Sequence, residues 1–409
     1  MDSLGNTNRL ISNFLSLSIV KGFQFLIPLI ILPYLLKTIG VEKFGQIAFV
    51  LSIAVYFGSI IQYGFSVTAT REISRCRGDK ERVGQIYSRV MSASLILAIT
   101  SMAVFTVIAS VLLDDSIPRV LYIGAISFII FQSLLPLWFF QGMERMKNIA
   151  IVNLMSSFLY LGLLISFVQD EADFVLVPIL NCIAVLIAYI ICILIIRFSF
   201  GITFSLPTIR NIMDVYVKGW PSFLSQFAPN LYNNTSLFFV GMTESSTIVG
   251  LYSTVVRVVD AVCSIGYILS STFLPYIAQD ISRHRLLEYL MLPAGVVLSS
   301  LLVLFNVPIS NFLVGDDHDI SLYLSVMSLS VVMLFIVITY GTNYLMLTGL
   351  DGYVGKVSVI VSVLAFILAV LIIPIMGIWG AIITLIVARF IMAIPIYLQY
   401  RISSKENSY

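Results

Sequence analysis

Hydrophobic residues gather into long blocks along this chain, and short clusters of charged residues, proline and glycine separate the blocks. Many blocks approach the ~20 residues with which a helix crosses a bilayer. Strand-type alternation is missing, which argues against an outer-membrane barrel. The pattern predicts about twelve transmembrane helices, near residues 11–36, 44–66, 88–113, 117–140, 149–168, 174–196, 215–240, 249–275, 289–313, 321–345, 356–374 and 377–400. A short turn around Pro374 and Gly377 separates the last two.

Composition supports an integral membrane protein. Of the 409 residues, 59% are hydrophobic and 11% are charged, too few charges to cover a soluble surface of this size. The first block is too long for a signal peptide and has no small-residue cleavage site, so we expect an uncleaved first span. The four cysteines are too scattered for a disulfide framework or a metal site. His284 and His318 are expected in solvated loops.

Basic residues are distributed unevenly between alternate loops, which predicts orientation. One side has sixteen lysines and arginines, six of them in a basic loop of about twenty residues after the second span, and the other side has three. Both termini are therefore expected in the cytoplasm. The connections are short, so the function is expected inside the membrane.

The two halves of the chain resemble each other. Val20–Phe23 recurs as Val217–Trp220, Gly45 pairs with Gly250, and Gly142–Glu144 recurs as a turn that begins at Gly349. An even number of spans separates the copies, so that both cross the membrane in the same sense and form a parallel repeat. We predict an all-α fold with two six-helix lobes, residues 1–200 and 201–409, related by a pseudo-twofold axis along the membrane normal, with a cavity between them.

Five charged residues fall within predicted spans, namely Lys21, Lys218, Arg257, Asp260 and Arg389. A cation facing lipid at the bilayer centre costs roughly 2.5–3.5 kcal/mol, so these side chains are expected to face the protein interior or a hydrated cavity. The excess of cations predicts an anionic passenger, such as a phosphate. Two alternatives stay open: Asp260 neutralises Arg257 three residues away, and Lys218 reaches the headgroups. Asp260 is also the candidate for a proton-linked switch.

Span seven is unusually polar. Two prolines, Pro221 and Pro229, predict a bent helix. Gln226, Asn230 and Asn233 share one helix face and are candidates for contacts with sugar hydroxyls. Span eight carries a continuous polar face of residues Ser253, Arg257, Asp260, Ser264, Tyr267 and Ser271. Span two has a weaker version, which close helix packing would also explain.

One segment, Trp138 to Met146, resembles a signature of the O-antigen and polysaccharide (Wzx-type) flippases of the multidrug/oligosaccharidyl-lipid/polysaccharide (MOP) exporter superfamily. Supporting segments are Gly64 to Glu72, Asn233 to Thr235, and Val249 to Tyr252. The similarity extends over essentially the whole chain. The first segment is fairly specific, whereas the others are shared more widely across the superfamily.

The resemblance implies a V-shaped alternating-access cavity and a substrate of undecaprenyl-diphosphate-linked O-antigen repeat units. Their passage would run from the cytoplasmic to the periplasmic leaflet. It implies a transporter rather than an enzyme, working beside membrane lipids and the glycan polymerase machinery, without nucleic acid or a cofactor. Coupling to protons or sodium is left open. The stretch Gly349 to Val357 lacks the spacing and the Ser or Thr of a nucleotide-binding loop.

Two other functions compete with this hypothesis. A drug or cation antiporter of the same superfamily would need unpaired carboxylates in its cavity, but basic residues outnumber acids within the spans. A membrane glycan polymerase or glycosyltransferase normally needs a sizeable outer loop, and these loops are short.

Overall fold

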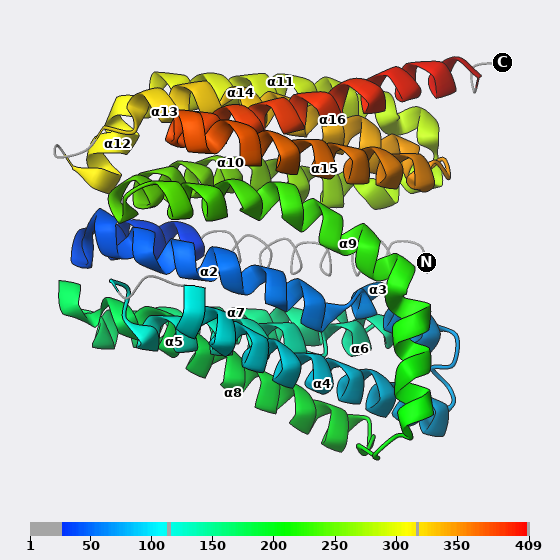
Figure 1. Cartoon of the computed structure of the whole chain (residues 1–409). Coiled ribbons are helices and arrows are strands. Elements are labelled where there is room, and N and C mark those ends of the chain that lie inside the picture. The colour runs from blue at the N-terminus through cyan, green and yellow to red at the C-terminus, as the bar shows by residue number, and fades with distance from the viewer. Residues whose placement is uncertain (1–26, 113–115, 316–318, 407–409) are drawn as a thin grey trace, which may run out of the picture. The chain divides into compact units, whose positions relative to one another are not determined.

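The computed structural model describes residues 27–112, 116–315 and 319–406, apart from the side chains of residues 111, 112, 225, 228–233, 275, 405 and 406 (Figure 1). Every regular element in these ranges is a helix, which confirms the predicted all-α class. The helices are Ile27–Thr38, α2 (Gly40–Gln62), α3 (Phe65–Ser74), α4 (Lys80–Leu112), α5 (Arg119–Leu134), α6 (Leu137–Gly142), α7 (Met146–Phe167), α8 (Leu176–Ser199), α9 (Ile209–Thr243), α10 (Ser246–Gln279), α11 (His284–Leu304), α12 (Asn306–Val314), α13 (Ser321–Met327), α14 (Leu329–Ile336), α15 (Asp351–Met376) and α16 (Ile378–Glu406). Short 3₁₀ segments precede α8 and α11, and a π-helical segment, Val337–Leu345, follows α14.

Ten helices among the described residues are long and apolar enough to cross a membrane. The more polar α9 occupies the seventh predicted position, and helix Ile27–Thr38 covers the described end of the first. The last pair of spans is confirmed, because only Gly377 separates α15 from α16. This glycine has φ +56°, a left-handed conformation in which a side chain would be strained. The chain is thus a multi-pass membrane protein.

The predicted basic loop after span two is wrong as a loop, because most of it is helical. The chain breaks after α2 at Tyr63 and Gly64, whose φ angles are 43° and 72°, and then resumes as α3. After a short turn, α4 begins at Lys80, eight residues before the predicted start of the third span. Asp79 caps it by accepting a hydrogen bond from the Arg82 backbone N–H at 3.0 Å. The positive charges are therefore held on helix ends.

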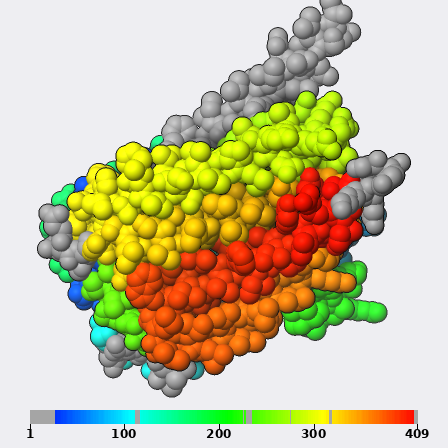
Figure 2. Space-filling model, turned by 90° about the horizontal axis from the view of Figure 1, so that it is seen from above, coloured from blue at the N-terminus to red at the C-terminus, as the bar shows by residue number. Residues whose placement is uncertain are grey.

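Exposed apolar side chains cover the outside of the helices. On α15 they include Ile360, Val363, Ile367, Leu371 and Ile375, spaced three or four residues apart on one face. Figure 2 shows the face on which α15 and α16 lie, in orange and red. Such a surface is costly in water and suits the hydrocarbon of a bilayer.

Contacts divide the described chain into two units. One contains residues 46–230, and the other contains residues 27–45 together with 231–406. The division crosses both α2 and α9. The predicted lobes 1–200 and 201–409 follow a different boundary and stay a prediction.

Backbone geometry reveals the internal repeat at a constant shift of 205 residues. In the turn after α6, the N–H groups of Met143, Glu144 and Arg145 donate to the carbonyls of Phe139, Gln141 and Phe140. In the second half, the N–H groups of Thr348, Gly349 and Leu350 donate to those of Tyr344, Met346 and Leu345. Each donor and each acceptor lies 205 positions after its counterpart. The next helices, α7 and α15, begin at residues 146 and 351, again 205 apart.

This register corrects one predicted pairing. Gly349, at φ +83°, corresponds to Glu144, at φ +55°, rather than to Gly142. The left-handed conformation is what the two turns share, and residue identity misled the sequence comparison because a glutamate occupies that position in the first copy. The pairing of Val20–Phe23 with Val217–Trp220 needs a shift of 197 residues and involves residues outside the described chain.

The pair Gly45 and Gly250 fits the same register and marks a close helix crossing. A Cβ atom added to Gly45 would lie 2.8 Å from the backbone nitrogen of Gly250 and closer still to the Ser246 carbonyl oxygen. One added to Gly250 would collide with the Val41 carbonyl oxygen. Matched glycines thus let the starts of α2 and α10 touch backbone to backbone, as small residues do in membrane helix pairs.

Candidate functional site

The unit that contains residues 27–45 and 231–406 has a charged site, an ion pair between α10 and α16. Arg389 Nη2 lies 3.1 Å from Asp260 Oδ1. The same guanidinium donates from Nη1 to Ser330 Oγ of α14 at 2.9 Å and contacts Cys263 Sγ at 3.6 Å. Cys263 lies three residues after Asp260, so both side chains lie on the face of α10 toward Arg389. Three helices therefore hold this one cation.

The two partners of this pair are buried to different extents. The Arg389 side chain is 8% exposed, whereas that of Asp260 is 57% exposed. A buried guanidinium needs acceptors and a counter-charge, and here Asp260, Ser330 and Cys263 supply them to its two terminal nitrogens. A ligand can therefore reach the Asp260 carboxylate from outside, whereas the Arg389 guanidinium is enclosed. This is the arrangement expected of a charge pair that a passenger or an ion could open.

Arg257 lies on the same helix as Asp260, but the ion pair that the structure shows for Asp260 is with Arg389. The Arg257 guanidinium lies 5.0 Å from the centroid of the buried Phe44 ring, within the range of a cation–π interaction. Arg257, Asp260 and Tyr267 are all exposed on their unit. Two other members of the predicted polar face, Ser264 and Ser271, donate hydrogen bonds back to the carbonyls of Ala261 and Ile268.

Lys218 belongs to the other unit. Its Nζ lies 2.6 Å from Asp214 Oδ2, one turn earlier on α9, and its side chain is 60% exposed. It lines a polar pocket with Arg75, Arg82 and Arg89. From the sequence, the arginines of this pocket were used only to predict the orientation of the chain in the membrane.

Of the predicted glycan contacts, Gln226 alone has a described side chain. Its Nε2 donates to Ser66 Oγ at 2.9 Å, which ties α9 to α3. The adjacent ring of Phe223 stacks on Tyr63, with centroids 4.9 Å apart. Part of the Gln226 amide is therefore used in holding α9 on the break between α2 and α3. The side chains of Asn230 and Asn233, and all of Lys21, lie outside the described chain, so their roles stay predictions.

The prediction that His284 is a solvated loop residue is wrong. Its side chain is buried at the start of α11, and Nε2 lies 2.9 Å from the Thr339 carbonyl oxygen. The rings of Tyr340, Tyr344 and Tyr400 surround it. The chain becomes helical earlier than its hydropathy indicated, which brings this histidine into the packed end of the bundle. The predicted position of His318 lies outside the described residues.

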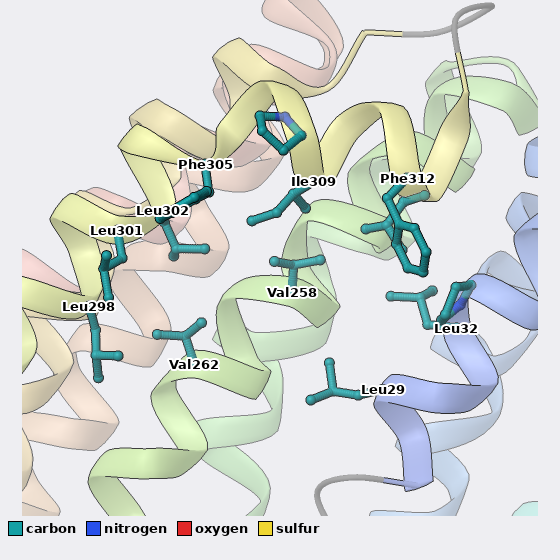
Figure 3. Close-up of a pocket in the computed structure, with 13 residues that line it drawn as sticks. Leu29, Leu32, Val258, Val262, Leu298, Leu301, Leu302, Phe305, Ile309 and Phe312 are labelled. Carbon is teal, nitrogen blue, oxygen red and sulfur yellow. The ribbon is translucent and has the colours of Figure 1, made fainter.

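An apolar pocket of about 580 Å³ opens beside the charged helix α10 (Figure 3). Leu29 and Leu32 of the first described helix, Val258 and Val262 of α10, and side chains of α11 and α12 point into it. Its walls offer no charged side chain. Such a lining can accept a hydrocarbon chain but cannot bind a sugar or a phosphate.

Sequence reasoning found Asp260 and Arg389 but missed Ser330, the neutral member of their cluster. Ser330 is completely buried in a helix that otherwise contains apolar residues, which was the available signal. A serine in that position can also bond to its own helix, as it does to the Met327 carbonyl oxygen, so its sequence context alone is ambiguous. Among the described residues, no group of three potential metal ligands occurs.

Comparison with known proteins supplies the remaining evidence. The profile of a family described as "Polysaccharide biosynthesis protein" matches residues 10–280. A protein of Escherichia coli (strain K12) named "Putative O-antigen transporter" is 24% identical over 299 residues, covering 73% of this chain and 72% of its own. A protein of the same name from Shigella dysenteriae is 22% identical, covering 93% and 98% of the two chains.

Solved structures share the fold at low identity. The lipid II flippase MurJ in an inward closed conformation has a TM-score of 0.70 at 13% identity and covers 94% of this chain and 87% of its own. An inward-facing multidrug resistance transporter of the MATE family, in the MOP superfamily, has a TM-score of 0.64 at 16% identity and covers 94% and 98%. At such identities the likeness establishes a common fold.

Proposed function

Because this chain belongs to the polysaccharide biosynthesis protein family, we propose that it is a flippase for lipid-linked oligosaccharides. The proposed substrate is an O-antigen repeat unit carried on undecaprenyl diphosphate, moved without chemical change from the cytoplasmic to the periplasmic leaflet. Two relatives are named for O-antigen transport, and one structural neighbour is named a lipid II flippase. The proposed location is the bacterial inner membrane, with both termini in the cytoplasm.

One observation carries this proposal: the enclosed Arg389 meets an accessible carboxylate on a membrane helix that also presents Arg257. A diphosphate approaching this face finds Arg257 exposed and a second cation behind Asp260. Since a carboxylate and a phosphate compete for the same guanidinium, the passenger can displace Asp260, which then becomes free to accept a proton. Substrate binding and the proton-linked switch are proposed to be coupled through this exchange, with no energy-supplying nucleotide.

The substrate has three chemically different parts. The diphosphate takes the cationic site. The glycan is proposed to contact the amides of α9, for which Asn230 and Asn233 remain the candidates. The lipid tail stays in hydrocarbon, and the apolar pocket beside α10 is a suitable place for part of it. The residues thus separate the polar head from its tail, as a flippase must.

The drug or cation antiporter is the second candidate function. Asp260 is the carboxylate that such a protein would use, but the structure pairs it with Arg389. A cationic drug would have to displace a buried guanidinium that cannot lose its charge. The flippase hypothesis requires instead that an anionic substrate replace the Asp260 carboxylate beside Arg389.

Reconstituted transport tests the proposal. Full-length protein in proteoliposomes is expected to move a fluorescent undecaprenyl-diphosphate oligosaccharide between leaflets without elongating it. Arg257→Ala is expected to reduce the rate at least about tenfold, the loss of one charged hydrogen bond to the substrate. The matched control Arg285→Ala removes an exposed charge from the same unit and is expected to retain the wild-type rate. Elongation of the glycan, or drug-driven proton release with no glycan movement, would refute the flippase.

A further inference from the structure

The polar pocket of the 46–230 unit has a volume of about 320 Å³. It lies among the end of α3, the first turns of α4 and the helix α9. On α4 the residues at positions 82, 86 and 89 are spaced by four and three and so line one face. The lining residues are Glu72, Arg75, Cys76, Arg82, Ile86, Arg89 and Lys218.

Carboxylates neutralise only part of the charge in this pocket. Glu72 Oε2 lies 3.7 Å from Arg89 Nη2, and Asp214 neutralises Lys218. Arg75 and Arg82 have no carboxylate within ion-pair distance in the described chain. Of the four cations in the lining, Arg75 and Arg82 are thus not paired with a carboxylate, although Asp79 lies close enough to act on Cys76.

Arg89 provides a second and independent indication of a ligand. Its side chain is three-quarters covered, at 25% exposed, and its Nε is buried without a hydrogen-bond acceptor in the described part of the protein. A buried N–H without an acceptor is costly, and a guanidinium N–H more so. Because Nε is covered, an oxyanion in the pocket would become its acceptor once the Arg89 side chain turns toward the opening.

Arg77 shows what a purely structural arginine in the same region looks like. Its Nη1 lies 2.7 Å from Glu144 Oε1, and its Nε donates to the Gly142 carbonyl oxygen at 2.6 Å. Both sets of donors are satisfied within the protein. The bias of basic residues toward one side of the membrane explains why arginines are present here, but not why one keeps a buried donor unused.

We propose that this pocket is a phosphate-binding site whose preferred ligand is a diphosphate. Forked guanidinium groups match the oxygens of phosphates, and two arginines without a carboxylate partner suit an anion with two phosphoryl groups. This part of the proposal rests on the proposed function: the diphosphate belongs to the lipid-linked substrate, which the pocket holds on the basic side before translocation. The phosphate of a membrane lipid offers the same oxygens with less charge, and the experiment separates these sources.

The test is titration calorimetry of the full-length protein in nanodiscs of zwitterionic lipid, with inorganic pyrophosphate as the probe. We expect tighter binding of pyrophosphate than of orthophosphate. Arg89→Gln is expected to weaken pyrophosphate binding at least about tenfold, and Arg89→Lys to weaken it less, because the charge remains while the fork is lost. The matched control Arg71→Gln removes the same charge from α3 outside the pocket lining and is expected to change binding by less than about twofold.

Equal losses in Arg71→Gln and Arg89→Gln would refute a built site and leave only a diffuse basic surface. Nanodiscs that contain undecaprenyl diphosphate are expected to compete with the soluble probe, whereas phosphatidylglycerol is expected not to compete. Competition by phosphatidylglycerol at equal concentration would overturn the diphosphate assignment in favour of a lipid headgroup. If Arg89→Gln abolishes pyrophosphate binding but leaves oligosaccharide flipping unchanged, the loading role is wrong while the flippase stands.

Discussion

The internal repeat contains the segment Gly40–Ser74 and, 205 residues later, the helix α10. These two copies place their charged residues differently. In α10 the helix is continuous, and Arg257 and Asp260 lie near its middle. Their counterparts in the first copy are Ser52 and Val55. There the helix breaks at Gly64 instead, and Arg71 and Glu72 follow the break.

This difference teaches how a duplicated membrane unit can acquire two kinds of charged site. A charge in the middle of a span must be matched, and Arg389 is held by Asp260 and Ser330. Charges at the end of a span lie near the membrane surface, where water and headgroups lower their cost. The pocket around Arg89 can therefore keep an excess of cations, whereas on α10 the enclosed Arg389 is paired with Asp260.

The strongest way to break the comparison is to prevent the two copies from touching. Gly250→Ala places a Cβ against the Val41 carbonyl oxygen and 2.9 Å from Val41 Cγ1, so backbone must move. We expect a loss of about 3 kcal/mol in the free energy of unfolding, measured by steric trapping in bicelles. The matched control Gly352→Ala in α15 meets no atom within 4 Å and is expected to gain up to about 1 kcal/mol. Similar values for the two variants would mean that the crossing is not close-packed.

The next variant opens the pair on α10. Asp260→Asn leaves the enclosed Arg389 without its counter-charge, and we expect a loss of about 2 kcal/mol, moderated because the carboxylate is more than half exposed. The double variant Asp260→Asn with Arg389→Gln is expected to recover more than half of that loss, because both charges are gone. Thermal unfolding in detergent provides the measurement. Additive effects in the double variant would contradict the coupling of these two side chains.

The shared turn gives a smaller and more specific test of the repeat. Gly349→Ala puts a Cβ at φ +83° and is expected to cost about 1–2 kcal/mol. Glu144→Gly removes the same strain at φ +55° but also the ion pair with Arg77, so these effects should offset each other to within about 1 kcal/mol. The two variants are compared by chemical unfolding in detergent. A larger loss for Glu144→Gly than for Gly349→Ala would show that the turns are not equivalent.

Hydropathy was sufficient to predict ten spans in the described chain, because a helix that crosses a bilayer consists of a local run of apolar residues. The pair Gly45 and Gly250 was also recognisable, since only glycine allows such an approach. The partner of Asp260 was not predictable: Arg257 lies three residues away, whereas Arg389 lies 129 residues away on another helix. The helix α3 and the burial of His284 were not predicted, because charged residues at the end of a span are equally compatible with a loop and with a helix.

The smallest effect concerns the thiol at the edge of the basic pocket. Burial raises the pKa of Cys76 above its ordinary value, while the nearby Arg82 guanidinium lowers it. A raised pKa means that less of the thiol is present as thiolate at any pH below that pKa. Alkylation by N-ethylmaleimide is therefore expected to be about two- to fivefold slower at pH 7.5 than in the denatured chain. The two rates should converge as the pH rises above the pKa of the folded state. Peptide-resolved mass spectrometry measures Cys76 separately from the other three cysteines.

Arg82→Gln removes the largest opposing charge and is expected to slow alkylation further, whereas Arg71→Gln, outside the pocket, should leave it unchanged. Faster alkylation in Arg82→Gln would show that access to the pocket, rather than its charge, controls the reactivity of this thiol. It would also weaken the distinction between the cationic pocket that follows the first copy and the Asp260–Arg389 pair on the second.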